Sequence, residues 1–263
     1  MNTDAFCRRI GIDPDTLDGP QLSTLERLQH AHVTTVPFEN LAVTGDPFDE
    51  SDDGEGVVLD EAHLFEKIVE RGCGGFCFEL NGLFNLVLSE LGFDVDRVAA
   101  RVIGSDGTGR PPANHLTNVV ELDRQYVVDV GTGPPTMRRP LPLDGSVRTD
   151  DVGVSWRVAP CDRPDETYVT QYRTESDDEW RDRYWFSETP RPFHYFEATC
   201  EYLQTAPEST FTGDPIVSIG TETGHLKLGR DTLTRTVGCD ETTEHVAEAQ
   251  WHEVLAREFG LQY

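Results

Sequence analysis

The chain has 263 residues and 37% hydrophobic content, enough for about one to two and a half packed domains and too much for a disordered acidic tail. Its 48 acidic and 22 basic side chains give a formal net charge of -26, which excludes partners that are held by basic stripes, namely nucleic acids and anionic membrane surfaces. No apolar run reaches the roughly 18 residues of a membrane span, and the first residues show neither the apolar stretch nor the cleavage pattern of an export signal. Six cysteines are too sparse for a secreted disulfide scaffold. We therefore expect a reduced, cytoplasmic protein.

The kinds of charged residue favour an origin in an extreme halophile. Only Lys67 and Lys227 are lysines, so 20 of the 22 basic residues are arginines, and the acidic residues are spread along the whole chain. Repulsion among so many like charges opposes compaction, but it is tolerable where molar salt shortens the screening length to about 3 Å. An ordinary acidic mesophilic protein is the alternative.

The first 92 residues are expected to be helical. Leucines recur at helical spacing over 22–28, and Asp60 is placed to cap a second helix that Gly72 ends. The clearest helix starts at Phe78, because apolar residues then follow at three- and four-residue spacing until Gly92 stops the pattern. That apolar face is predicted to be core.

After residue 92 the pattern changes to short β-rich runs separated by Gly, Pro and Asp, which predicts a sheet or barrel in the middle third. The glycine- and proline-rich stretch Ser105–Asn114 is predicted to be a surface loop. Beyond residue 192, further strands and a final helix with an apolar side are expected, the helix ending at Gly260. The predicted strands are Arg97–Ile103, Leu116–Leu122, Tyr126–Val130, Ile216–Ile219 and Leu226–Leu228, and the apolar side of the final helix is Val246, Ala247, Val254 and Leu255.

Cys77 is the first candidate for chemistry, because it follows a glycine-rich turn and directly precedes the clearest helix. A thiol at a helix N-terminus faces unpaired backbone N–H groups and the positive end of the helix dipole, which favour the thiolate. The same N–H groups are candidates for an oxyanion site. Taken alone, an inert buried cysteine is the commoner interpretation.

His115 and Asp129 are the candidate base and orienting acid, since they lie on consecutive predicted strands joined by a short turn. If that turn has an odd number of residues, or a bulge shifts the parity, both side chains point to one face; an even loop separates them. In the favourable register Asp129 holds the imidazole, and His115 takes the proton of Cys77. This arrangement is that of cysteine acyl transfer.

The stretch Arg71–Asn81 and four further segments form an ordered set of motifs along nearly the whole chain. In this order they resemble the signatures of the arylamine N-acetyltransferase family, in which Arg71–Asn81 is similar to the nucleophile motif. The four further segments are Val36–Leu41, Asn114–Leu116, Tyr126–Gly131 and Tyr202–Phe211.

The resemblance implies an α+β fold of the transglutaminase-like type, with a helical domain (1–92), a β-barrel domain (93–192) and an α/β lid (193–263). It implies a catalytic triad of Cys77, His115 and Asp129. The implied reaction is ping-pong: the cysteine takes an acetyl group from acetyl-coenzyme A and passes it to an arylamine, hydrazine or arylhydroxylamine.

The resemblance also implies ligand contacts. Tyr202 and Ser209 are expected to contact coenzyme A, while Thr132 and Phe38 are expected to line the acceptor pocket. Thr132 stands where the family commonly has an aromatic or small polar residue, so acceptor size or polarity is expected to differ. Cations that face the anionic cofactor are sought among four arginines, namely Arg110, Arg138, Arg139 and Arg230.

Several other features are given structural roles. Cys73 and Cys77 have no second pair of ligands, so no metal site is expected, although the two thiols are close enough in sequence for an oxidative disulfide. By family analogy, Glu39 and Arg71 are expected to form a buried ion pair that Glu79 supports. The stretch Trp180–Trp185 is read as ordinary strand and core.

Two alternatives remain at the level of sequence. The same triad serves an amide synthase, an acyltransferase using another acyl donor, or a hydrolase with water as acceptor. In the other alternative, the chain is a salt-adapted interaction module without catalysis, in which Cys77 merely packs and reacts with alkylating agents no faster than Cys161 or Cys239.

Overall fold

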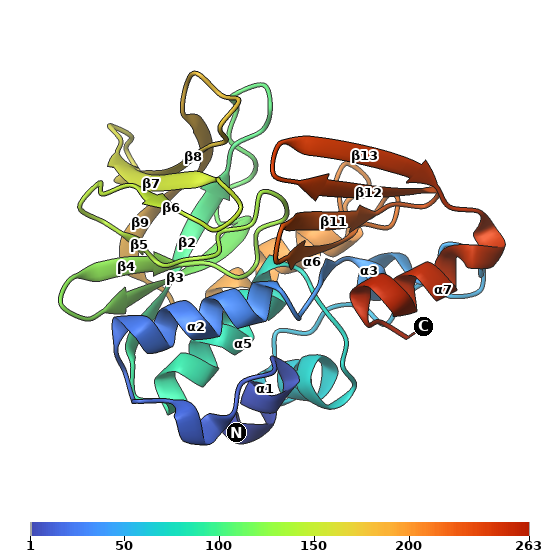
Figure 1. Cartoon of the computed structure of the whole chain (residues 1–263), viewed down its shortest axis with the longest axis horizontal. Coiled ribbons are helices and arrows are strands. Elements are labelled where there is room, and N and C mark those ends of the chain that lie inside the picture. The colour runs from blue at the N-terminus through green and yellow to red at the C-terminus, as the bar shows by residue number, and fades with distance from the viewer. Residues whose placement is uncertain (1, 263) are drawn as a thin grey trace.

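The computed structural model describes residues 2–262, in which helices and strands combine into an α+β fold. The helices lie mainly in the first 90 residues, with two more near the C-terminal end, as Figure 1 shows. They are α1 (Thr3–Arg9), α2 (Leu22–Val33), α3 (Leu41–Thr44), α4 (Glu61–Phe65), which continues into a π-helical turn (Glu66–Glu70), α5 (Cys77–Glu90), α6 (Glu197–Thr205) and α7 (Glu248–Phe259). Two 3₁₀ turns span Pro14–Thr16 and Phe193–Phe196.

The middle of the chain forms an antiparallel eight-stranded sheet in the order β5-β4-β3-β2-β9-β8-β7-β6. Its end strand β5 also contacts β7, so the sheet curls into a nearly closed barrel. The strands are β2 (Asp94–Val102), β3 (His115–Glu121), β4 (Gln125–Val128), β5 (Leu141–Pro142), β6 (Arg148–Thr149), β7 (Ser155–Pro160), β8 (Tyr168–Arg173) and β9 (Arg181–Pro190).

A second antiparallel sheet has the order β1-β10-β11-β12-β13 and lies beside the barrel, with α7 beneath it in Figure 1. Its edge strand β1 (Phe38–Glu39) comes from the first part of the chain, which was predicted to be helical only. The other strands are β10 (Val217–Thr221), β11 (Gly224–Leu228), β12 (Thr232–Val237) and β13 (Asp240–His245).

Three hydrophobic cores hold these parts together. The largest joins α1, α2, α4 and α5 to one face of β3 and β4, and it also receives Phe196 and Leu203 from the α6 region. The second lies between α7 and the five-stranded sheet, around Trp251. The third fills the barrel, around Trp156 and Tyr184. Helix α5 thus packs against β2 and β3, and β3 begins with His115.

The main predicted elements are confirmed, and their ends have the expected caps. The Asp60 carboxylate accepts hydrogen bonds from the first N–H groups of α4, and Gly260 adopts the left-handed conformation that ends α7. The final helix begins only at Glu248, after Val246 and Ala247. Helices α1 and α6 and strands β12 and β13 were not predicted, because their apolar residues are too few to give a periodic signal.

No helix among residues 2–262 combines the length and apolar character that crossing a bilayer requires. All six cysteines are free thiols.

Candidate active site

The turn before Cys77 is fixed by pairing with an earlier segment. Residues Phe38 and Gly75 form a parallel bridge, and the N–H of Glu39 donates to the Gly75 carbonyl at 2.9 Å. Gly74 allows this approach, because a Cβ there would lie 2.3 Å from the Pro37 carbonyl oxygen. Two of the motifs found in the sequence are therefore one structural unit.

A buried charge cluster supports the same turn, and it corrects one prediction. Lys67 Nζ lies 2.6 Å from Glu79 Oε1 and 3.7 Å from Glu39 Oε1, and all three side chains are at most 3% exposed. The second carboxylate oxygen of Glu79 accepts from the N–H of Phe76 at 3.0 Å. The predicted Glu39–Arg71 pair is wrong: Lys67 takes the place of Arg71, whose guanidinium instead forms a half-exposed pair with Glu55 at 2.7 Å.

The hairpin of β3 and β4 puts the candidate base and acid on one face. Glu121 pairs with Gln125, so three residues form the loop, and Asn118 pairs with Val128. Continuing this register sets Asp129 opposite Thr117, two residues from His115, which is the neighbouring position on the same face. The loop is therefore of the odd kind that the sequence argument required for a working pair.

His115 Nε2 lies 2.6 Å from Asp129 Oδ2, and both side chains are buried. The other carboxylate oxygen, Oδ1, accepts from Asn81 Nδ2 at 2.8 Å and from the N–H of Gly131 at 2.9 Å. Asn81 also donates to the Leu116 carbonyl at 2.7 Å and accepts from the N–H of Val130 at 2.9 Å. One amide on α5 therefore fixes both strands of the hairpin.

Sequence reasoning assigned no role to Asn81, although it stands four residues after Cys77 and thus on the same side of the helix. Burial alone would raise the pKa of Asp129. The charge of His115 and the hydrogen bonds from His115, Asn81 and the Gly131 N–H outweigh burial, so the pKa of Asp129 is lowered. The carboxylate therefore stays ionised. With Nε2 engaged by Asp129, Nδ1 is the imidazole nitrogen left for a second partner.

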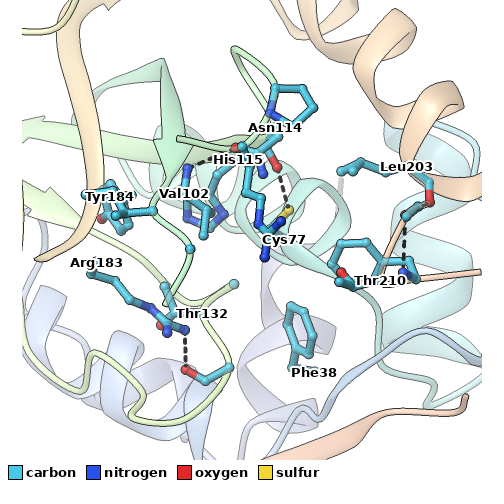
Figure 2. A pocket seen from close by; sticks show the side chains of 18 of the residues that line it. Phe38, Cys77, Val102, Asn114, His115, Thr132, Arg183, Tyr184, Leu203 and Thr210 are labelled. Carbon is cyan, nitrogen blue, oxygen red and sulfur yellow. Dashed lines mark hydrogen bonds between the residues drawn. The ribbon is translucent and has the colours of Figure 1, made fainter. Parts of the chain in front are cut away.

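Cys77 is the first residue of α5, and its thiol lies in the same cavity as His115 (Figure 2). Its Sγ is 3.8 Å from the carbonyl oxygen of Asn114, the residue before His115. Gly131, two residues after Asp129, lies against its backbone, since a Cβ on that glycine would be 2.7 Å from Cys77 Cα. Any other residue at position 131 would push the hairpin away from the nucleophile.

The N–H groups at the start of α5 favour the thiolate, as expected, but they do not outweigh the other influences on the Cys77 thiol. Burial, and next the negative charge of Asp129, raise the pKa of the Cys77 thiol well above its ordinary value, while the N–H groups of Leu116 and Phe78 only oppose this rise. A thiolate at this site therefore needs a positive partner. Transfer of the thiol proton to His115 supplies one, because it creates an imidazolium beside Asp129.

A cavity of about 500 Å³ opens at Cys77 between the barrel, the nucleophile turn and the segment after α6. Its wall includes all four residues that the sequence predicted for ligand contact, namely Phe38, Thr132, Tyr202 and Ser209. We refer to this cavity as the active-site pocket. Figure 2 shows Phe38 and Thr132 on the side of the pocket opposite Asn114.

Two of these polar groups already have partners within the protein. The Tyr202 hydroxyl donates to Glu208 Oε1 at 3.1 Å, and the Ser209 hydroxyl donates to the Leu203 carbonyl. Ser209 Oγ therefore has only acceptor capacity left, which it shares with the N–H of Phe211.

Of the four arginines that the sequence suggested for the anionic cofactor, one lies at the pocket. Only Arg110 lines the pocket; the other three candidates lie elsewhere. Arg138 is buried against Asp150, Arg139 pairs with Asp151, and Arg230 lies over the ring of Phe48. The pocket instead contains Arg183, so interpreting Trp180–Trp185 as ordinary strand and core was wrong at that position.

Cys73 does not share the pocket of Cys77. It lines a separate cavity of about 370 Å³, with Lys67, Arg71 and Leu261, on the other side of the turn. The suggested disulfide between the two is absent from the structure. Within residues 2–262, no group of three or more His, Cys, Asp or Glu side chains is arranged to hold a metal ion.

Comparisons with known proteins agree with this geometry. The model of a family described as N-acetyltransferase matches residues 21–263. The arylamine N-acetyltransferase of Mycolicibacterium smegmatis is 31% identical over 99% of this chain and 92% of that protein. The arylamine N-acetyltransferase of Bacillus cereus, which has a Cys-His-Glu catalytic triad, superposes with a TM-score of 0.88 at 25% identity over 100% of both chains. That of Mycobacterium marinum, solved in complex with CoA, gives 0.84 at 28% identity over 98% of this chain and 92% of that one.

Proposed function

Because the chain belongs to the arylamine N-acetyltransferase family, we propose that it moves an acetyl group from acetyl-coenzyme A to an arylamine, hydrazine or arylhydroxylamine through a thioester on Cys77. The observation that carries the proposal is the 2.6 Å contact of Asp129 with His115, which lines the same pocket as the Cys77 thiol. A nucleophile, a base and an orienting acid are the parts that cysteine acyl transfer requires.

In the acylation half-reaction, His115 Nδ1 takes the proton of Cys77, and Sγ attacks the thioester carbonyl carbon. The tetrahedral intermediate carries a negative oxygen, for which the N–H groups at the start of α5 are the nearest helix-terminal donors. The carbon–sulfur bond to coenzyme A then breaks, and the leaving thiolate takes the proton back from the imidazolium. Asp129 stays ionised throughout and stabilises the imidazolium.

In the second half-reaction, the amine nitrogen attacks the acetyl carbon of the thioester. An arylamine is weakly basic and so neutral at pH 7, which leaves its lone pair free. His115 takes a proton from the nitrogen and returns it to Sγ as the carbon–sulfur bond breaks. The amide leaves, and the thiol is restored.

Ligand contacts are proposed on the pocket wall. Tyr202, in the last turn of α6, and Ser209, in the segment after it, are assigned to coenzyme A, and Phe38 and Thr132 to the acceptor. Phe38 supplies an apolar ring that stacks with an aromatic amine, and Thr132 leaves more room beside Gly131 than an aromatic residue would.

The test is steady-state kinetics of coenzyme A release with a neutral arylamine. A double-displacement reaction gives parallel lines in reciprocal plots at several amine concentrations, and Cys77→Ala must lose at least about 10³-fold in rate. Cys161→Ala is the matched control, because that thiol is half-buried and outside the pocket. Intersecting lines, or normal turnover by Cys77→Ala, would contradict the thioester.

The domain layout is also proposed: a helical domain (1–92), a barrel domain (93–192) and a lid (193–263). It is supported by the three hydrophobic cores, although β1 joins the sheet of the lid and α6 packs into the core of the helical domain. We further propose a cytoplasmic location in a salt-rich cell, from the free thiols and the charge of -26.

A further inference from the structure

Arg183 is the unexplained group of the active-site pocket. It lies on β9 with its guanidinium directed to the side where Thr132 and Phe38 lie, as Figure 2 shows. Within residues 2–262 its guanidinium makes one hydrogen bond, from Nη2 to the carbonyl oxygen of Gly133 at 2.9 Å. Among residues 2–262, no carboxylate lies within ion-pair distance of it, although acidic residues outnumber basic ones two to one.

Two acidic groups near this guanidinium cannot serve as its ion-pair partner. Asp129 is close enough to act on it electrostatically, but both Asp129 oxygens are occupied by His115, Asn81 and Gly131. The neighbouring phenol of Tyr184 is neutral, since burial raises its pKa well above the ordinary value.

Two other charged side chains on the pocket wall each have a polar neighbour within the protein. Glu208 accepts from Tyr202, and Arg110 faces the carboxylate of Asp106 at the mouth. A partly buried cation with a single neutral acceptor is costly, and it retains free N–H donors in a fixed planar fork. Those donors match a carboxylate or a phosphate, so the side of the pocket on which they lie must decide which ligand carries the group.

We propose that Arg183 determines acceptor specificity by binding a carboxylate carried on the aromatic ring of the amine, so that aminobenzoates are preferred to neutral arylamines of the same shape. This inference rests on the proposed function. The acceptor is the favoured carrier of the carboxylate because Arg183 and Thr132, a residue assigned to the acceptor, lie together in Figure 2, and Arg183 donates to the residue after Thr132.

The experiment compares 4-aminobenzoate with 4-aminobenzamide, which has nearly the same shape without the charge. For the wild type and for Arg183→Gln, kcat/KM is measured with each amine, and its value for the benzoate is divided by its value for the benzamide. Comparing this quotient between the two proteins cancels the intrinsic nucleophilicity of the amines. We expect Arg183→Gln to lose about 10- to 100-fold for the benzoate, the effect of a charge-assisted hydrogen bond, and to change less than about 3-fold for the benzamide. Arg183→Lys should recover part of the loss.

Arg181→Gln is the matched control. It removes the same charge from the same strand, but Arg181 is exposed and paired with Asp177 outside the pocket. A second arm supplies malonyl- and acetyl-coenzyme A with the benzamide. If Arg183→Gln impairs only malonyl transfer, the carboxylate belongs to the acyl group, and the assignment to the acceptor is overturned.

A measurement on the wild type keeps the inference testable if Arg183→Gln does not fold. Benzoate must compete with the neutral amine at least about 10-fold more strongly than benzamide does. Equal inhibition, or equal losses for both amines in Arg183→Gln, would overturn the role of Arg183. If the wild type forms no acetyl-enzyme with acetyl-coenzyme A, the proposed function itself fails instead.

Discussion

Replacing Asp129 by Asn tests how the hairpin and α5 set the state of His115. The Oδ1 side of Asp129 faces two donors, Asn81 Nδ2 at 2.8 Å and the N–H of Gly131 at 2.9 Å. In Asp129→Asn the amide oxygen must stay on that side, because an NH₂ group there would face two donors. The NH₂ group is therefore directed at His115 Nε2.

This orientation gives the imidazole the wrong tautomer. An amide donor at Nε2 requires Nε2 to accept, so the single proton of neutral His115 moves to Nδ1, the nitrogen that must receive the proton of Cys77. The fall in acylation rate should be about 10³- to 10⁴-fold, which corresponds to about 4 to 5.5 kcal/mol in the barrier. The fold should persist, because the two side chains have nearly the same volume.

Two measurements check this. Rapid-quench kinetics follow the release of coenzyme A in the first turnover, and the ¹⁵N chemical shifts of His115 report which nitrogen carries the proton. Asp129→Glu is the control, because it keeps a carboxylate, the group that also completes the triad of the Bacillus cereus relative; it should retain more activity than Asp129→Asn. Turnover of Asp129→Asn within about 10-fold of the wild type, or a proton still on Nε2, would refute the tautomer argument.

Three further predictions concern stability. Lys67→Met should lower the free energy of unfolding by about 3 to 5 kcal/mol in urea titrations, because it leaves Glu39 and Glu79 buried without a cation. Adding Glu79→Gln should restore part of that loss. If the losses of the two single variants simply add in the double variant, the charge cluster is contradicted. Burial lowers the pKa of His32 to about 3, so below pH 6.5 the unfolded chain takes up a proton that the folded chain refuses. The free energy of unfolding should therefore fall by about 1.4 kcal/mol per pH unit from pH 6.5 toward pH 5. His32→Phe should reduce this pH dependence, and the control His194→Gln, at an exposed histidine, should leave it unchanged. Thermal melts should rise in temperature as KCl is increased from about 0.1 to 3 M, since screening relieves the repulsion of a chain with charge -26; a melt that does not change with salt would contradict salt adaptation.

Apolar periodicity and capping residues allowed the main helices to be predicted from the sequence. Helix α5 was predictable because its apolar spacing is unbroken from Phe78 to Gly92, and the end of α7 because Gly260 follows its last apolar residue. Strand β13 was not, since all of its residues are exposed and none alternates with an apolar neighbour. Strand β1 is only two residues long and exists because β10 pairs with it.

The site was predictable where sequence separation is short and the motifs are specific. The relation of His115 to Asp129 reduces to the length of one hairpin loop, so a count of residues decides it. The partner of Glu39 depends on how α4 and its π-helical turn pack against the nucleophile turn, and Lys67 could not be chosen over Arg71 from spacing. Arg183 reaches the pocket through the curl of the barrel, a long-range property without a local signal.

The central claim is that the sulfur of Cys77 carries the acetyl group between the two substrates. The most direct test is the mass of the intact protein after incubation in high salt with acetyl-coenzyme A and no amine. The wild type should gain one acetyl group, located on Cys77 by peptide mapping and lost on addition of an arylamine, and Cys77→Ala should gain none. An unchanged mass of the folded wild type, or an acetyl group that an arylamine does not remove, would contradict the account.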